Sequence, residues 1–553
     1  MKPAKLIQFL FAFGSMIVPY GFGQVNNLPQ VHHVIIVIQE NRTPDNLFGS
    51  DAFSSSPQLP GANLAKQGKC LGSTVPLTSY TLDACFDPDH AHLQPYPSWI
   101  QMYNKGAMDG ACEISISERS CTSLKYPNYT YVDNAQGQIQ PYFDMAKQYG
   151  YANFFFQTNQ GPSFPAHQFL FGGTSAPVYD DGDANQYWTW FAAENHKENA
   201  YGCVGTQLIL EIDPSGAESP GYNGGLPCYN HNTLVDLLDQ YKISWKYYPQ
   251  GPTQSSAGSA LWTAPNAILN ICQPQSGACT GAEWETNVAA EIPPNPPVRG
   301  AMAPILSDIE NCKLPAVSWV IPDGSWSDHA GYNSDFKGPA WVTAIVNAVG
   351  NDKTCEAKKG YWSDTVILVV WDDWGGWYDH VLPYRCDDGV CKGYSNDTGG
   401  QYVYGFRVPF LVVSAYAKPG YISGAMPPYG KGQTVPYIHD FGSILNFIEY
   451  AFGQHGEPLH LAGSPPNSGI SPDYAYADVL APDAFTSGNC KQSECPYGLS
   501  DFFDFAQAPI TFQTIALPAR LTGFNAKYFE DFGTHPGDPK PSDPDDDATD
   551  GDE

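Results

Sequence analysis

The stretch TVILVVWDDWGGWYDH, residues 365–380, indicates the fold class of the chain. Its first half is a short run of apolar, mostly β-branched residues, which is typical of a strand buried on both faces. The run then ends in two aspartates and a Gly-Gly turn. Three other segments have the same form, namely HVIIVIQ (33–39), AVSWVIPDG (316–324) and VPFLVVSAYA (408–417). We interpret all four segments as buried strands.

Helix-like segments lie between these strands. The clearest are residues 232–241, with Asn232 as the expected N-cap, residues 341–349 and residues 437–452. Alternation of strands and helices predicts the α/β class with a largely parallel central sheet. The intervals at about 50–150 and 170–230 are rich in Gly, Pro, Asn, Tyr and Cys and have weak periodicity. We therefore predict disulfide-bearing loop insertions there, over one end of the sheet.

The charge of the chain narrows the choice of partners. Of 553 residues, 27 are Lys or Arg and 57 are Asp or Glu, so the net charge is −30. Such a chain is a poor ligand for nucleic acid or for an anionic bilayer. The stretch HPGDPKPSDPDDDATDGDE (535–553) is rich in Pro and Asp and has almost no apolar residue, which predicts a disordered tail. Weak calcium binding is the alternative, but the tail lacks the ligand spacing of an EF-hand.

The first residues and the cysteines indicate the compartment. Lys2 and Lys5 precede an apolar stretch (6–18), and small residues follow, so we interpret residues 1–23 as a signal peptide. No run is long enough for a transmembrane segment. The 14 cysteines include close pairs and no C-x-x-C motif. These features favour disulfides over a zinc site and predict a secreted or periplasmic protein, while the disulfide connectivity stays open.

Polar residues follow two of the predicted strands at the edge where ligands bind in open α/β sheets. Glu40 and Asn41 follow the first strand, and Asp372 and Asp373 follow the third. Three carboxylates and an amide oxygen at one edge would repel one another without a cation between them, and oxygen ligands suit a hard divalent metal. The alternative is that these acids cap helices or pair with bases such as Arg42.

A nucleophile candidate is Ser163, which follows a Gly-Pro turn after the apolar segment YANFFFQ. No G-x-S-x-G elbow or nearby Ser-His-Asp order marks a hydrolase triad, so activation of this hydroxyl would have to come from a metal. The alternative is an ordinary turn residue.

Three histidines beside acids or turns are candidates for binding a phosphate oxygen or protonating a leaving group: His90, His329 and His380. His92 and His167 are weaker candidates of the same kind. The alternative for each is a hydrogen-bonded structural histidine.

Six motifs in order resemble the bacterial phosphoesterase family that contains phospholipases C and acid phosphatases. They span residues 39–453 and are QENRTPDNLFG (39–49), DPDH (87–90), GPSFPAHQ (161–168), WDDWGGWYDHV (371–381), RVPFLVVSAYAKPGYIS (407–423) and HDFGSILNFIEYAFG (439–453). The resemblance implies an alkaline phosphatase-like three-layer α/β/α sandwich, here a catalytic domain over residues 24–534.

The resemblance also implies roles for individual residues. A divalent metal ion of unknown identity would be held by Glu40, Asn41, Asp372 and Asp373. Ser163 matches the metal-bound nucleophile of the family. His90 and His329 are similar to the histidines that contact the phosphoryl group.

Three departures from the family pattern bear on the substrate. Asp373 stands where many phospholipases C have Glu, and Trp374 where they have His. Phe441 replaces a His found in many relatives, and the chain ends soon after the last motif. These departures favour an acid phosphatase. The alternatives are a phospholipase C acting on diester lipids such as phosphatidylcholine, and a non-catalytic secreted binding protein on the same fold. The sequence leaves the leaving group and the oligomeric state open.

Overall fold

The computed structural model of the chain describes residues 26–82, 86–88, 90, 98–118, 124–175, 191–194, 202–205, 208–212, 218–219, 226–249, 261–292, 302–322, 324–330, 337–384, 386–387, 390–391, 404–425, 438–460 and 498–517. The predicted signal peptide, the predicted acidic tail and His92 lie outside these ranges.

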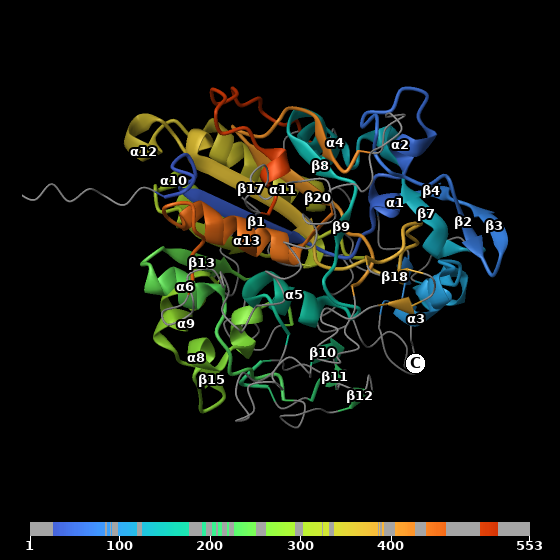
Figure 1. Cartoon of the computed structure of the whole chain (residues 1–553), viewed down its shortest axis with the longest axis horizontal. Helices are drawn as coiled ribbons and strands as arrows, with labels where there is room; N and C mark the ends of the chain where they lie inside the picture. Colours follow the sequence, from blue (N-terminus) through green and yellow to red (C-terminus); the bar gives the residue numbers. More distant parts are fainter. Residues whose placement is uncertain are drawn as a thin grey trace, which may run out of the picture.

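A seven-stranded sheet forms the centre of the molecule (Figure 1). Its order is β13 (Trp245–Tyr248), β16 (Val317–Val320), β1 (His33–Gln39), β17 (Thr365–Trp371), β20 (Phe410–Ser414), β8 (Gly150–Ala152) and β21 (Tyr421–Ser423). The four predicted strands are the neighbours β16, β1, β17 and β20, and every residue of β1 and β17 is buried. Only β20 runs against its two neighbours, so the prediction of a largely parallel sheet is confirmed.

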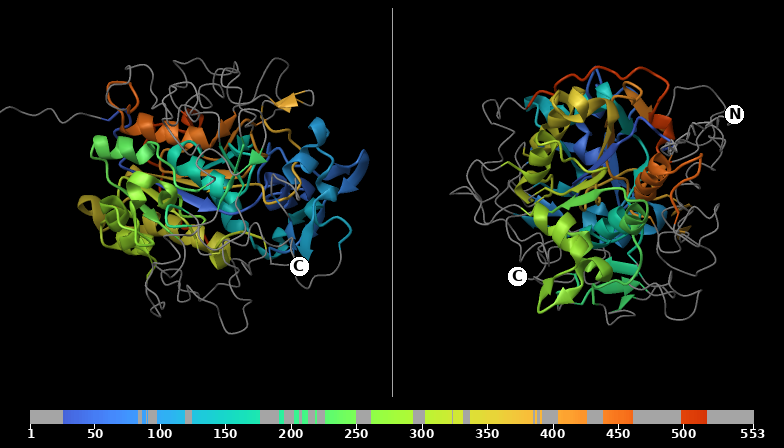
Figure 2. Two further views of the ribbon diagram at one scale, coloured as in Figure 1. Left: turned by 90° about the horizontal axis from the view of Figure 1, so that it is seen from below. Right: turned by 90° about the vertical axis from the view of Figure 1, so that its left-hand side faces the viewer.

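Helices cover both faces of this sheet. On one face α11 (Lys337–Asn351) packs against β17, and α4 (Gln140–Gln148) packs against β20 and β8. On the other face α5 (Ser163–Gly172) and α13 (Phe441–Phe452) pack against each other. Figure 2 shows the sheet between α11 and α13. Because α4 lies in the interval 50–150, the end of that predicted insertion belongs to the layer that covers the sheet.

Capping side chains set where two helices begin. Helix α6 (Leu234–Gln240) is capped by Thr233 and not by the predicted Asn232, because Thr233 forms a capping box with Asp236. Helix α13 begins later than predicted, after Asp440, whose carboxylate accepts a hydrogen bond from the Ser443 amide at 3.0 Å. A side-chain acceptor that pairs with the third helical residue is the stronger N-cap.

Four disulfides lie within the described ranges: Cys70–Cys112, Cys203–Cys228, Cys272–Cys279 and Cys312–Cys355. Cys272 and Cys279, a close pair in the sequence, form a disulfide with each other. Cys70, in contrast, pairs with Cys112, which lies 42 residues away. Disulfides of this number agree with an oxidising compartment. Among the described helices, none has both the length and the apolar character needed to cross a membrane.

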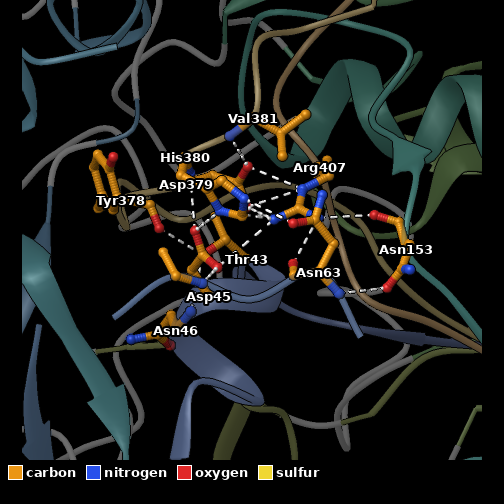
Figure 3. A network of polar contacts seen from close by, with 11 residues as sticks. Thr43, Asp45, Asn46, Asn63, Asn153, Tyr378, Asp379, His380, Val381 and Arg407 are labelled. Carbon is orange, nitrogen blue, oxygen red and sulfur yellow. Dashed lines mark hydrogen bonds and ion pairs between the residues drawn. The ribbon is translucent and has the colours of Figure 1, made fainter. Parts of the chain in front are cut away.

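A buried ion network ties the segment after β17 to the segment after β1 (Figure 3). The Arg407 guanidinium donates to Asp379 through Nε at 2.9 Å and Nη2 at 2.9 Å, and Nη2 lies 3.7 Å from Asp45 Oδ1. Asp45 Oδ2 also accepts hydrogen bonds from the amide of His380 at 2.8 Å and from its Nδ1 at 2.6 Å. Both carboxylates and the arginine are fully buried, so each charge depends on its partners.

Another buried carboxylate, that of Asp328, lies between the sheet and α4. Asp328 Oδ2 accepts hydrogen bonds from the Tyr142 hydroxyl at 2.8 Å and from Trp371 Nε1 at 3.1 Å. Burial raises the pKa of Asp328 to about 6, because these hydrogen bonds and the nearby charge of Arg42 offset only part of the desolvation cost.

Replacing Arg407 by methionine should lower the free energy of unfolding by about 3–5 kcal/mol, because two buried carboxylates lose their cation. Urea unfolding of Arg407→Met, Asp379→Asn and the double variant measures this. The double variant should lose less than the sum of the single losses, since Asp379→Asn removes one of the orphaned charges. Strictly additive losses would contradict this account of the network.

The Asp328 carboxyl should make stability fall as pH rises. Its pKa is higher in the folded chain than in the unfolded one, so the folded state holds more protons between about pH 4 and 6, and its stability falls across that window. Asp328→Asn removes this titration. Relative to wild type, the variant should therefore gain up to roughly 3 kcal/mol between pH 4 and 7 in urea unfolding. An equal difference at both pH values would show that Asp328 does not titrate in this range.

Candidate active site

The acidic residues that follow β1 and β17 lie side by side. The two strands pair in parallel register from His33 with Thr365 to Gln39 with Trp371, so the chain leaves both strands at the same level. The amide of Asn41 donates to Asp372 Oδ1 at 3.1 Å, and the amide of Arg42 donates to the carbonyl of Asp373 at 3.0 Å. The structure thus brings together Glu40, Asn41, Asp372 and Asp373, all fully buried.

The turn at Asn41 is tight. Asn41 adopts a left-handed backbone conformation with φ 58°, which asparagine tolerates better than most residues. Gly375 lies against it, and a Cβ there would come within 2.4 Å of the Asn41 carbonyl oxygen. Glycine at 375 therefore lets the loop after β17 close onto the loop after β1.

Ser163 is the first residue of α5, directly after Pro162. Its Oγ lies 3.3 Å from Glu40 Oε2 and 3.2 Å from Asp373 Oδ2. One hydroxyl proton faces two carboxylate oxygens, so the structure places the predicted nucleophile among the predicted ligands.

His90 and His329 lie at the far end of the Asn41 amide. That end of the amide is 2.9 Å from His329 Nε2 and 3.2 Å from His90 Nε2. Each ring has its Nδ1 beside a backbone carbonyl, of Pro88 for His90 and of Ala330 for His329. Nδ1 is therefore the protonated nitrogen of the neutral rings, and Nε2 can accept from the Asn41 amide group.

This tautomer turns the Asn41 carbonyl oxygen toward acids. With Nδ2 toward the histidines, 3.2 Å from His90 Nε2, the amide oxygen faces only acceptors, namely Asp372 Oδ1 at 3.1 Å and Glu40 Oε2 at 3.2 Å. This orientation needs a cation between the oxygens, because without one the reversed amide would donate to both carboxylates and accept from the two rings. The other oxygen of Asp372 is buried and makes no hydrogen bond. Converging oxygens without protons fit a divalent cation, which Glu40, Asn41, Asp372 and Asp373 could hold.

His167, only a weak candidate in the sequence, lies at the cluster of carboxylates. It lies one helical turn after Ser163 on α5, with Nε2 3.2 Å from Glu40 Oε1 and 3.6 Å from Asp372 Oδ2. Burial acts to raise the pKa of Asp372, but the interaction with the nearby His167 ring acts against it and brings the pKa to about 2. The spacing of four residues from Ser163 in a helix is the signal that could have identified it.

His380 is not brought to this cluster. Its Nδ1 contacts Asp45 and its Nε2 lies 2.9 Å from Asn63 Oδ1, within the Arg407 network of Figure 3. Asp45, Asp379 and His380 have ligand atoms within 4.8 Å of one another, as do Glu40, His167 and Asp372. In the group of Asp45, Asp379 and His380 the Arg407 guanidinium already supplies a positive charge, so this group has less need of a metal ion than the group around Ser163.

Comparison with known proteins finds relatives that are named phospholipase C. The chain is 23% identical over 458 residues to a non-hemolytic phospholipase C of Pseudomonas aeruginosa, covering 77% of this chain and 54% of that protein. It is 21% identical over 449 residues to the hemolytic phospholipase C of the same organism, covering 78% and 54%. Phospholipase C B of Mycobacterium tuberculosis is 24% identical over 468 residues, with 78% and 76% covered.

The chain thus spans about half the length of the Pseudomonas relatives. The profile of the phosphoesterase family matches residues 31–454. That range contains the loops after β1 and β17, the start of α5 and the two histidines at the Asn41 amide. The chain therefore belongs to the phosphoesterase family.

Proposed function

We propose that the chain hydrolyses phosphate esters, with Ser163 as the nucleophile and a divalent cation held by Glu40, Asn41, Asp372 and Asp373. The observation that carries the proposal is the position of Ser163 Oγ, 3.3 Å from Glu40 and 3.2 Å from Asp373. Family membership supports it. The relation to alkaline phosphatases that the sequence predicts is part of the same proposal.

When bound, the cation would offset the carboxylates and lower the cost of deprotonating the Ser163 hydroxyl. Ser163 Oγ then forms a bond to phosphorus as the bond from phosphorus to the leaving-group oxygen breaks. A monoester leaves a phosphoserine, from which water releases phosphate, and a diester leaves a phosphodiester of Ser163, from which water releases a phosphate monoester. Both steps need little covalent chemistry beyond positioning and charge stabilisation.

His90 and His329 hold the phosphoryl oxygens and protonate the leaving group in this proposal. Because Nδ1 of each ring is beside a carbonyl, Nε2 carries a proton only in the imidazolium form. Proton donation from Nε2 therefore requires the charged ring. The proposal accordingly includes an optimum on the acid side of neutrality.

Phospholipids are the substrate class that the comparisons favour. The relatives reported above carry the name phospholipase C, so they support the diester alternative more directly than the acid phosphatase favoured by the sequence. We therefore place phosphodiester lipid cleavage first. The predicted secreted or periplasmic location, supported by the four disulfides, suits a substrate outside the cytosol.

A phosphate monoester is the second candidate, on the strength of Trp374. The resemblance to the family places this residue where many phospholipases C have His. Its indole is fully buried, and its ring centre is 4.7 Å from that of Phe406. It therefore contributes packing, and the polar group that a histidine would provide at this position is missing.

Replacing Ser163 by alanine should reduce kcat/KM by about 10³-fold or more, because the nucleophile is lost. The assay compares an aryl phosphorylcholine diester with an aryl phosphate monoester across acid to neutral pH, with divalent metals supplied. Cleavage of the diester supports the phospholipase C assignment, whereas cleavage of the monoester alone replaces it with the phosphatase. Ser175→Ala, a buried serine just beyond α5, is the matched control and should keep its activity. An active Ser163→Ala enzyme would refute the mechanism.

Chelation should abolish hydrolysis of whichever ester is cut and also lower the thermal unfolding midpoint, because the buried carboxylates lose their counter-charge. Calorimetry before and after treatment with a chelator, followed by readdition of metal, measures both effects. Full activity after complete metal removal would contradict the cation site.

A further inference from the structure

His167 is a buried histidine to which the mechanism above gives no role. It has no exposed surface, and its ring is parallel to that of Trp262, with centroids 6.4 Å apart. Its Nε2 points at two of the carboxylates, as described above. No other candidate histidine approaches both Glu40 and Asp372 among the described residues.

The hydrogen bonds of His167 differ from those of His90 and His329. Nδ1 of His167 is buried and makes no hydrogen bond, whereas Nδ1 of the other two rings faces a carbonyl. A proton on Nδ1 would therefore be left without an acceptor, which is costly in a buried site. The neutral ring accordingly carries its proton on Nε2, and so does the charged ring, so Nε2 acts as a donor in both forms.

An Nε2–H group cannot ligate a metal, but it can orient the groups that do. Glu40 has Oε1 on His167 and Oε2 toward Ser163, 3.3 Å from its Oγ. The hydrogen bond thus selects which carboxylate oxygen faces the nucleophile. Asp372 Oδ2, which is buried and makes no hydrogen bond, lies 3.6 Å from the same nitrogen.

We infer that His167 is a positioning residue whose hydrogen bond orients Glu40, beside Asp372, in the arrangement that binds the cation. This inference rests on the cation site in the proposed function. Hydrogen-bond donors of this kind, one shell beyond the ligands, set ligand orientation, and their loss typically weakens metal affinity 10- to 100-fold. His167 and Ser163 share one face of α5, so the helix positions the nucleophile and the donor together.

Calorimetric titration of the chelator-treated full chain tests the inference without relying on catalysis. Mg²⁺, Ca²⁺, Mn²⁺ and Zn²⁺ are titrated into the wild type, and the tightest binder is used for the variants. His167→Phe keeps a ring but no donor, and its cation Kd should rise about 10- to 100-fold. His167→Gln can place an amide N–H near the position of Nε2 and should recover most of the affinity.

His231→Phe is the matched control. His231 is also buried and lies at the other end of α5, beside Gly172, where its Nδ1 contacts the carbonyl of Asn232. This variant should bind the cation as the wild type does, even if it is less stable. Thermal unfolding of each chelator-treated variant checks that it is folded. If His167→Phe does not fold, His167→Gln is compared with the wild type instead.

The outcomes separate the two claims. A wild type that binds none of the four cations would remove the cation site and this inference with it. A wild type that binds while His167→Phe binds equally well or more tightly would overturn the inference alone, and so would a His167→Gln variant as weak as His167→Phe.

Discussion

The parallel pairing of β1 with β17 is the constraint on which the site depends. Seven consecutive residue pairs, all buried, fix the register of these strands. A shift by one residue would turn every side chain of a strand to the opposite face, so the register is strongly specified. Because both strands end at the same level, Glu40 and Asp372 must emerge as neighbours, and their mutual repulsion is a consequence of the fold.

The negative charges of the buried carboxylates are compensated in two different ways. Asp45 and Asp379 share the Arg407 guanidinium, a permanent cation, and their network joins the two loops that carry the site. Glu40, Asp372 and Asp373 have histidines and a serine hydroxyl around them in the described contacts. The guanidinium neutralises the first group permanently, so that group stabilises the fold. The second group has no such permanent cation among these contacts, which suits it to binding an exchangeable one.

Backbone carbonyls determine how each histidine of the site can act. His90 and His329 each face a carbonyl through Nδ1, so their Nε2 atoms accept in the neutral form and donate only when charged. His167 has no such partner and donates through Nε2 in either form. In the proposed mechanism the same residue type therefore supplies proton transfer at two positions and ligand orientation at a third, and the distinction lies in the second ring nitrogen.

The amino-acid sequence was enough to predict the four central strands, the α/β class and the acid or amide residues that follow two of the strands. Burial on both faces demands an uninterrupted apolar run, and that run is visible in one dimension. Ordered motifs also identified the family. The antiparallel direction of β20 could not be predicted, because an apolar run does not show whether its strand pairs parallel or antiparallel to its neighbours.

Tertiary structure also decided which histidines belong to the site. His380 follows Asp379 in a motif near the ligands, yet Asp45 and Asn63, more than 300 residues away, hold its ring elsewhere. His167 was a minor candidate in sequence, and the turn of α5 carries it to Glu40. The local sequence pattern predicts burial, turns and helix caps. The partner of a polar side chain, however, lies in a distant segment, and the packing of the sheet and its helices determines which segment that is.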